Sequence, residues 1–491
     1  TDSLTIISQG DGYLVTGTTG SYSNLPMNLL RTYTENGNLF FSGFMPSANL
    51  IELTSLFGNI TFASSTNALN ATANANGDGG YLSVQAQNIY SSALALNAAG
   101  TTGNGGQILV NQNGTNPLRI GPGALSVNVE NAPGMNGGSV TVMSRGNISA
   151  NAAYINMGET FAPGQGANLT LQTTGGKLYL DHINNLPSTL HNLTLASGST
   201  SNFKLGDASS NGNGIGDENR TLSADNLTII NSVGGITRGE SGNLIARDHL
   251  LLHGQTGIGS VNNPIKVITP DLGVFAPEGS AFVTIKDSSN TDFASQVANT
   301  LSVTSTGSLN VLGPINAQTL VLDVNGVNAL ETSATSITAS TGSGDLYINN
   351  TSASAPLTVD GLSAPGSVTI LTGSDLTTTD TISAGTNVLL TASGGMVIGK
   401  NVNAQNGTAE LYAYGGNLTN AGNGSYRVNA NQVNLFAGGA IGSAALPFRS
   451  GAANITLNGG DVYLANRTTS STAVTNLLTS NVGSLNFTQT N

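Results

Sequence analysis

The sequence predicts an all-β chain folded as a parallel β-helix, or β-solenoid, with little or no α-helix. Composition is the first observation behind this prediction. Charged residues are 8% of the 491 residues, against about 25% in an ordinary soluble domain. Lys, Glu, Arg and Gln, which normally cover helix surfaces, are scarce. Glycine, with 64 residues, and Asn, Ser and Thr take their place.

Short strands are the second observation. They are predicted where apolar and polar residues alternate strictly over four to six positions and end at Gly or Asn. One form places two glycines before the strand, and the other reads Asn-Leu-Thr-Leu or a close variant. The first form begins at Gly79, Gly105, Gly137, Gly175 and Gly459, and the second at Asn168, Asn192, Asn226 and Asn454.

The spacing of these strands is the third observation. A helix could fit between the first four Gly-pair strands, but the residues there lack the 3.6 period of a helix. A sandwich of this length would need several domains and linkers, whereas a solenoid grows by adding coils. We expect about 20–25 residues per coil and on the order of 20 coils. Disorder is the alternative, but the regular alternation argues against it.

In such a coil, each residue type is expected to have its own position. Inward Leu, Ile and Val stack into a continuous core, and outward Thr and Ser suit a solvated strand. Asn and Gly are expected to accept the left-handed backbone that the corners require.

Two segments differ from the regular body. Residues 1–58 hold many of the aromatic residues, including the run FFSGFM from Phe40, and are expected to form an N-terminal cap or docking segment. Residues 59–491 are expected to form the β-helix. Within it, 234–287 and 415–468 look like copies of one unit. Ile258-Gly259-Ser260 recurs as Ile441-Gly442-Ser443, and at the same offset Ile245, Leu250 and Leu252 align with Val428, Val433 and Leu435.

The Gly- and Asn-rich strands, and the run from Ile258 through Asn263-Pro264-Ile265 to Val283, resemble the filamentous-haemagglutinin-like exoproteins of bacteria. The resemblance covers about residues 75–487. It implies a right-handed parallel β-helix that is secreted and used for adhesion. The expectation is therefore a non-catalytic, extracellular structural or adhesive protein of a bacterial surface.

The partners expected on this basis are a second copy or the continuation of a longer chain, joined head-to-tail into a fibre. A host or neighbouring-cell surface, or a polysaccharide, is expected as well. Because the chain begins at Thr1 rather than Met, we also expect it to be a processed or trimmed product.

Charge and hydropathy exclude several classes of function. The net charge is −12 and the sequence shows no basic patch, so we expect no nucleic-acid partner, because phosphate binding needs clustered Lys and Arg. No apolar run approaches the length of about 18 residues that a membrane-spanning helix needs, which predicts no membrane span. The absence of cysteine excludes disulfides and thiolate sites.

The main alternative is a carbohydrate-active β-helix enzyme, either a polysaccharide lyase or a hydrolase. Glycoside hydrolysis needs two carboxylates on one face. Asn290-Thr291-Asp292 resembles one motif of the polygalacturonase-like hydrolases, but the partner motifs, Asp-Asp and Gly-His-Gly, are missing. We therefore expect a turn there and no catalytic residues. A flat ice-binding surface is a third class, suggested by Thr377, Thr378, Thr379 and Thr381, although their spacing does not repeat.

Two sets of residues are candidate metal ligands. The segment from Asp207 to Glu218 fits a loose calcium-loop pattern in which Asp207, Ser209, Asn211 and Glu218 supply oxygens and Gly212 makes the turn. No amphipathic helix flanks it, so a solvated loop is the expected structure and calcium is a weak candidate. His249 and His253 share one strand face, but a metal would need a third ligand. We expect two outward histidines and no cofactor.

Overall fold

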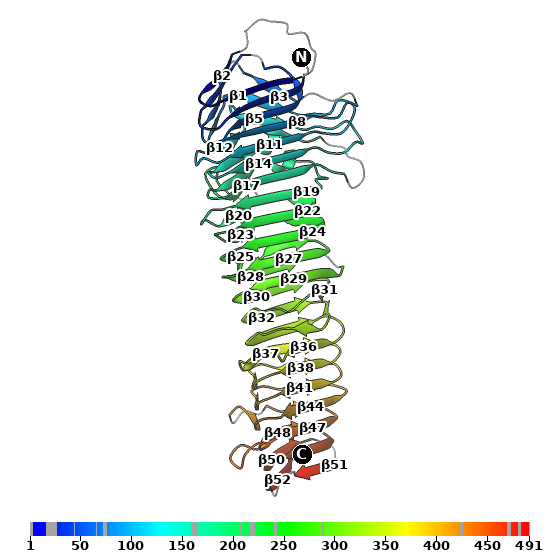
Figure 1. The fold of residues 1–491 in the computed structure, drawn as a ribbon. Helices are drawn as coiled ribbons and strands as arrows, with labels where there is room; N and C mark the ends of the chain where they lie inside the picture. Colours follow the sequence, from blue (N-terminus) through cyan, green and yellow to red (C-terminus); the bar gives the residue numbers. More distant parts are fainter. Residues whose placement is uncertain are drawn as a thin grey trace. The chain divides into compact units, whose positions relative to one another are not determined.

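The computed structural model describes residues 3–15, 27–43, 45–64, 66–71, 76–158, 165–206, 208–216, 221–239, 243–286, 289–422, 426–468, 473–479 and 483–490. In these residues the secondary structure consists of 52 strands and two 3-10 helices, Ala152–Tyr154 and Ile183–Asn185. The chain divides into two units, Thr1–Thr269 and Pro270–Asn491. Within each unit the strands are stacked one after another in chain order (Figure 1). The prediction of an all-β parallel β-helix is therefore confirmed.

The first unit is built on one long rank of parallel strands, each paired with its equivalent in the next coil. A short coil separates Leu29 from its partner Leu50, and a long one separates Tyr179 from Gly214 in a second rank. The coils of this unit are mostly longer than expected. The rank runs through β1 (Ser3–Ser8), β3 (Met27–Thr34), β5 (Ala48–Ser55), β8 (Tyr81–Ala86), β11 (Gln107–Gln112), β14 (Ser139–Ser144), β17 (Asn168–Thr173), β19 (Asn192–Ser197), β22 (Leu222–Asn231) and β24 (Leu244–Gly254).

The parallel register stacks like residues on like residues and so forms the core. Ile51, Leu82, Ile108, Val140 and Leu169 lie one above another, and each is at most 1% exposed. A second column, two residues further along each strand, contains Val110, Val142 and Leu171. Burying a Val or Leu side chain contributes roughly 1.5–3 kcal/mol, so stability accumulates coil by coil.

The second unit contains two main ranks. One is an eight-stranded sheet of β34 (Leu330–Glu331), β36 (Leu346–Asn350), β38 (Val368–Thr372), β41 (Val388–Ala392), β44 (Thr408–Ala413), β47 (Gln432–Ala437), β49 (Asn454–Gly459) and β51 (Ala473–Thr479). The other runs through β28 (Ser280–Ile285), β30 (Thr300–Ser305), β32 (Thr319–Val324), β35 (Ser336–Thr341), β37 (Leu357–Ala364), β40 (Ile382–Ala384), β43 (Val402–Ala404), β46 (Val428–Asn429), β48 (Phe448–Gly451), β50 (Val462–Arg467) and β52 (Leu485–Thr490). Partners such as Val368 and Val388 are separated by a coil of the expected length.

Asparagine does not have the backbone role expected from the sequence. Among the described residues with left-handed φ, all are glycines except Ala93 and His182. The asparagines act instead through their side chains, which bond from coil to coil. The Asn192 amide donates to Asn168 at 2.6 Å, and the Asn226 amide donates to Asn192 at 3.1 Å. The expectation of left-handed asparagines was therefore wrong, because their side chains satisfy polar groups of the neighbouring coil.

Strands in the segment 1–58 are the first coils of the same solenoid. Strands β1, β3 and β5 pair in parallel and lead directly into β8. Phe41 is 1% exposed and stacks on Phe62, with the ring centroids 5.2 Å apart. Phe40 is half-buried, and Phe44 lies outside the described residues. A capping or docking role for this segment stays a prediction.

The two Ile-Gly-Ser sequences make the same local turn. Ile258 and Ile441 are both fully buried, and Gly259 and Gly442 have φ values of 65° and 67°. In each turn the serine N–H donates to the carbonyl three residues later, at 3.2 Å for Ser260 and 3.0 Å for Ser443.

The proposed copies are out of step further upstream. Ile245 is half-exposed, and its neighbour Leu244 is the buried residue. Leu244 pairs with Val267, as Val428 pairs with Ser450. The aligned partner of Val428 is therefore Leu244. Because 234–287 extends over both units, superposition of the whole copies stays a prediction.

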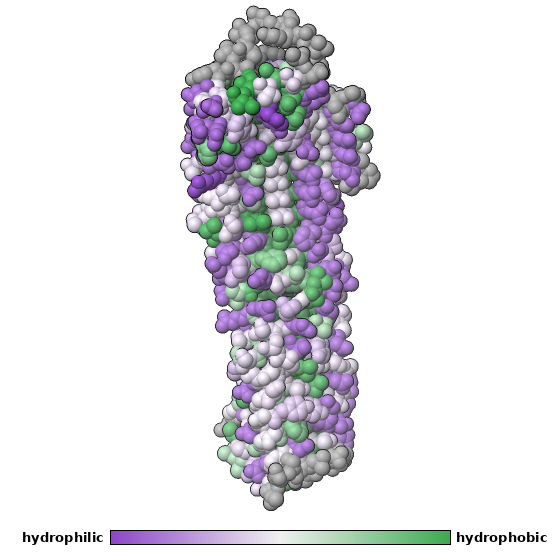
Figure 2. Space-filling view, in the orientation of Figure 1, coloured by the Kyte–Doolittle hydropathy of each residue, from purple (hydrophilic) through white to green (hydrophobic). Residues whose placement is uncertain are grey.

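In the part of the chain that the structure describes, no helix has the length and apolar character needed to cross a membrane. On the face drawn in Figure 2 most residues are white to purple, and green residues occur in separate groups. Each unit thus presents a largely polar strand surface to solvent on that face.

Candidate functional site

An open groove on the first unit has a volume of about 560 Å³. Its floor is built by β12 (Leu118–Ile120), β15 (Ile148–Asn151) and β18 (Leu178–Asp181), which pair so that Arg119, Ser149 and Tyr179 form one row. Asn147 and Lys177 precede the last two strands and add a second row. The segment Ser210–Gly212 forms a wall.

Hydrogen bonds hold the groove in shape. The Asn147 side-chain oxygen accepts the Lys177 backbone N–H at 2.8 Å, and Lys177 Nζ donates to the Asn211 carbonyl at 3.2 Å. The Tyr179 hydroxyl donates to Asp181 at 2.9 Å. The residues that line the groove in the described chain include two cations, Arg119 and Lys177, and no carboxylate. A groove of this size and lining suits a hydroxyl-rich or acidic ligand.

Only part of the candidate calcium loop lies among the described residues, and that part borders this groove. Asp207 and Glu218 lie outside the described residues. Ser209 and Gly212 form a tight turn, with the Gly212 N–H donating to the Ser209 carbonyl at 2.6 Å. The Lys177 ammonium lies at the Asn211 carbonyl, and its positive charge opposes a cation there. Among the described residues, no three His, Asp or Glu side chains form a group that could hold a metal ion.

His249 and His253 lie where the sequence places them, half-exposed on the same face of β24. A different cluster, formed by His191, Asp225 and Arg247 from three consecutive coils, was not predicted. His191 Nδ1 lies 3.1 Å from Asp225 Oδ2, and Arg247 Nε donates to Asp225 Oδ1 at 2.5 Å. Burial alone would raise the pKa of Asp225. Hydrogen bonds from His191 and Arg247, and their charges, outweigh burial and lower that pKa.

The hydrolase-like motif Asn290-Thr291-Asp292 lies at the start of a strand. Thr291 is fully buried in β29 (Thr291–Val297). Asp292 accepts a hydrogen bond from Asn310 at 2.8 Å, and Asn310 accepts one from Asn328 at 3.1 Å. Asp292 is thus the first member of a ladder of side chains that links successive coils. The motif belongs to a strand and not to the expected turn.

The threonine run at 377–381 does not present one outward row. Thr378 is buried, and Thr379 bonds to Asp360 and to the Val359 carbonyl. Thr378 therefore belongs to the core, and Thr379 bonds to the preceding coil.

An aromatic platform on the second unit was also not predicted. We use this name for Tyr412, Tyr414 and Phe436, which lie in β44, directly after it, and in β47. Their ring centroids are 5.3 to 6.2 Å apart, and the two tyrosine rings are within 16° of parallel. Tyr414 is 54% exposed.

Polar groups border the platform on the same strands. Glu410 accepts a hydrogen bond from the Asn434 amide at 3.0 Å and from the Tyr412 hydroxyl at 3.4 Å. Burial, with the Glu410 charge and hydrogen bond, raises the pKa of the Tyr412 hydroxyl. Tyr412 lies opposite Phe436, and Glu410 opposite Asn434, in the parallel register. The signal available in the sequence was the recurrence of Tyr412 and Phe436 one coil apart.

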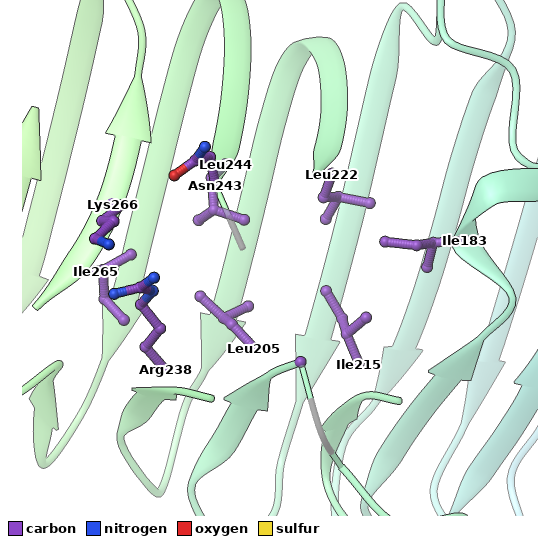
Figure 3. A pocket seen from close by; sticks show the side chains of 10 residues that line it. Ile183, Leu205, Ile215, Leu222, Arg238, Asn243, Leu244, Ile265 and Lys266 are labelled. Carbon is purple, nitrogen blue, oxygen red and sulfur yellow. The ribbon is translucent and has the colours of Figure 1, made fainter. Parts of the chain in front are cut away.

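A small cavity inside the first unit has a different character. It has a volume of about 20 Å³, and Leu205, Ile215 and Leu222 point into it (Figure 3). Arg238 extends beside Leu205, and burial lowers the pKa of its guanidinium. A space of this volume holds about one water molecule. It is a gap in the packing and is too small for a substrate.

No protein-family model, curated protein or solved structure matches this chain. Function is therefore inferred from the chemistry of the surfaces described above.

Proposed function

We propose that this protein is a non-catalytic structural and adhesive β-helix of a bacterial cell surface, which holds polysaccharide on its outer strands. The aromatic platform is the observation that carries the proposal. Aromatic side chains are enriched at binding surfaces, and burying one is favourable by roughly 1.5–3 kcal/mol. Here two rings on paired strands and a third directly after the strand lie together, beside a carboxylate and an amide.

Sugar rings suit this arrangement chemically. The apolar C–H face of a pyranose packs against an aromatic ring, and its hydroxyl groups bond to carboxylate and amide groups. Tyr412 and Tyr414 present nearly parallel rings 6.0 Å apart, while Glu410 and Asn434 supply acceptors and donors next to them. Tyr412 and Phe436 stand on paired strands of the solenoid, and Tyr414 follows one of them directly, so regular structure positions the platform.

The binding test uses the whole protein on immobilised polysaccharides. We expect Tyr414→Ala to weaken retention at least tenfold while the melting temperature changes little, since the side chain is exposed. Tyr90→Ala is the matched control, because Tyr90 is an exposed tyrosine of the first unit, at 45%, and lies outside the platform. Equal retention of wild type and Tyr414→Ala on every polysaccharide bound would contradict the role of the platform.

Head-to-tail assembly into a fibre is the second part of the proposal. Edge strands of a β-helix present N–H and C=O groups to other chains, and heterologous contacts of this kind build filaments. Among the described strands, β1 pairs with β3 on one side only, and its Ile7 is 72% exposed. Phe41 is buried in the core. The run FFSGFM from Phe40 therefore has less aromatic surface for docking than the sequence suggested.

Light scattering over a range of concentrations tests the assembly. We expect the wild-type mass to rise with concentration, and Ile7→Lys to suppress the rise, because a charge on an edge strand opposes pairing. A wild-type protein that remains monomeric at every concentration would rule out the fibre.

A carbohydrate-active enzyme is the second candidate function, and the groove on the first unit is the observation that favours it. Its volume fits a saccharide, and a lyase uses a basic side chain as the proton acceptor, a role that Lys177 or Arg119 would have to take. A glycosidase would need two carboxylates there. Release of shortened saccharides distinguishes this candidate from adhesion.

A further inference from the structure

Three arginines converge on one cavity of the second unit. Arg427 precedes β46, Arg449 lies in β48 and Arg467 ends β50. The parallel register places Val428 opposite Ser450, so Arg427 is level with Arg449, and Arg449 lies opposite Ala465, two residues before Arg467. Together with Ala465 and Thr490, the three side chains line a cavity of about 340 Å³.

The concentration of positive charge is unusual for this chain. Residues 270–491 contain five Lys and Arg against twelve Asp and Glu, and three of those five cations line this cavity. Burial is the main cause that lowers the pKa of the Arg427 guanidinium, and the positive charges of Arg467 and Arg449 lower it further, because like charges repel. An anion in the cavity would relieve that repulsion.

The side chains define the chemistry of such an anion. Guanidinium groups bond in a bidentate way to carboxylate, sulfate and phosphate oxygens, and Thr490 adds a hydroxyl. Adjacent strands are about 4.8 Å apart, so neighbouring arginines can contact different oxygens of one group. The cavity is open and large enough for a single charged sugar ring, within the range of small-ligand sites.

We propose that Arg427, Arg449 and Arg467 form an oxyanion-binding site that takes a sulfate, phosphate or carboxylate group, either free or carried on an acidic saccharide. The site is separate from the aromatic platform, and its occupation can be measured whether or not the protein is an adhesin.

Titration calorimetry at constant ionic strength tests this site. The probes are inorganic sulfate, inorganic phosphate, a sulfated disaccharide and a trigalacturonate. We expect at least one probe to bind to the wild-type protein, each of Arg427→Gln, Arg449→Gln and Arg467→Gln to weaken it about tenfold or more, and the triple variant to abolish binding. Tighter binding of a saccharide than of the free ions identifies the saccharide as the source of the anion, and the reverse order identifies the free ion.

Two further variants keep the result interpretable. Lys286→Gln removes one positive charge from an exposed position in the same unit and should change affinity less than twofold. Arg449→Lys keeps the charge without the bidentate geometry, so it should fold and bind with intermediate affinity. The anion-free melting temperature of each variant is measured alongside, so that a loss of binding is separated from a loss of folding. Absence of binding to all four probes, or equal binding by wild type and triple variant, would overturn the proposal.

Discussion

Polar side chains close the corners of the first unit from inside the coil. Ser144 stacks on Gln112 and under Thr173, at the ends of paired strands, and all three are buried. Their side chains bond to backbone groups of the turns, as when the Thr173 hydroxyl donates to the Gly176 carbonyl at 2.6 Å. The composition suggested that Ser and Thr side chains face water. Composition alone could not distinguish these inward-pointing polar residues from the outward-pointing ones.

Asn231 shows what this inner position demands. It is fully buried, and its amide donates to the Ser201 and Gly235 carbonyls, both at 2.9 Å, while its oxygen accepts the Gly234 N–H at 3.2 Å. Asn231→Ala would leave buried backbone groups unsatisfied, at about 1–3 kcal/mol each. Chemical denaturation should show a loss of at least that size. Asn111→Ala, at a half-exposed position of β11, should cost less than about 0.5 kcal/mol, and equal losses would contradict the role of the amide.

Side-chain alternation along a strand gives a second prediction at this scale. Val142 is fully buried between Val110 and Leu171, whereas Thr141 is half-exposed on the opposite face. Val142→Asp places a charge in a stacked apolar column, and we expect a loss of roughly 3–5 kcal/mol in the free energy of unfolding. Leu178→Asp, also fully buried, should behave alike. Thr141→Asp should be nearly neutral, and a comparable loss there would refute the register.

The sequence form of a strand does not determine which strand is its neighbour. Strands of the Gly-pair form and of the Asn-Leu-Thr-Leu form belong to one rank, since Ser139 of β14 pairs with Asn168 of β17. The Gly-pair strand that begins at Gly175 becomes β18, which pairs instead with β15. Alternation therefore predicted the strands and their buried residues. It could not predict which strands are neighbours, because coil length varies with the turns.

The His191, Asp225 and Arg247 cluster gives an element-level prediction about pH. Because the folded-state pKa of Asp225 is lowered from the ordinary value, its ionised form stabilises the fold. That contribution is complete above the unfolded pKa, near 3.9, and is lost as the pH falls through the folded pKa. The free energy of unfolding of the wild type should thus decline on acidification below about pH 5.

The matched variants isolate this carboxylate. Asp225→Asn should lower stability at neutral pH and show a smaller decline on acidification, measured by denaturation across the pH range. Asp248→Asn, at an exposed position of β24, should leave the decline unchanged. A decline of the same size in wild type and Asp225→Asn would show that Asp225 does not contribute.

At the scale of the whole molecule, the fold could be predicted and the binding surfaces could not. Arg427, Arg449 and Arg467 are separated by about one coil each, so the sequence shows three scattered cations where the solenoid brings them together. Tyr412 and Phe436 are likewise one coil apart. In a β-helix, sites form between coils, and finding them requires the register of every turn.

Adhesion without cleavage is the central functional claim. The decisive measurement incubates the intact protein with a panel of neutral and acidic polysaccharides, and follows both retention and released saccharides by mass spectrometry. We predict that at least one polysaccharide is retained, that no shortened or unsaturated product accumulates, and that Tyr414→Ala reduces retention. Products that accumulate with time and disappear in Lys177→Gln would contradict this account and establish the groove as an active site.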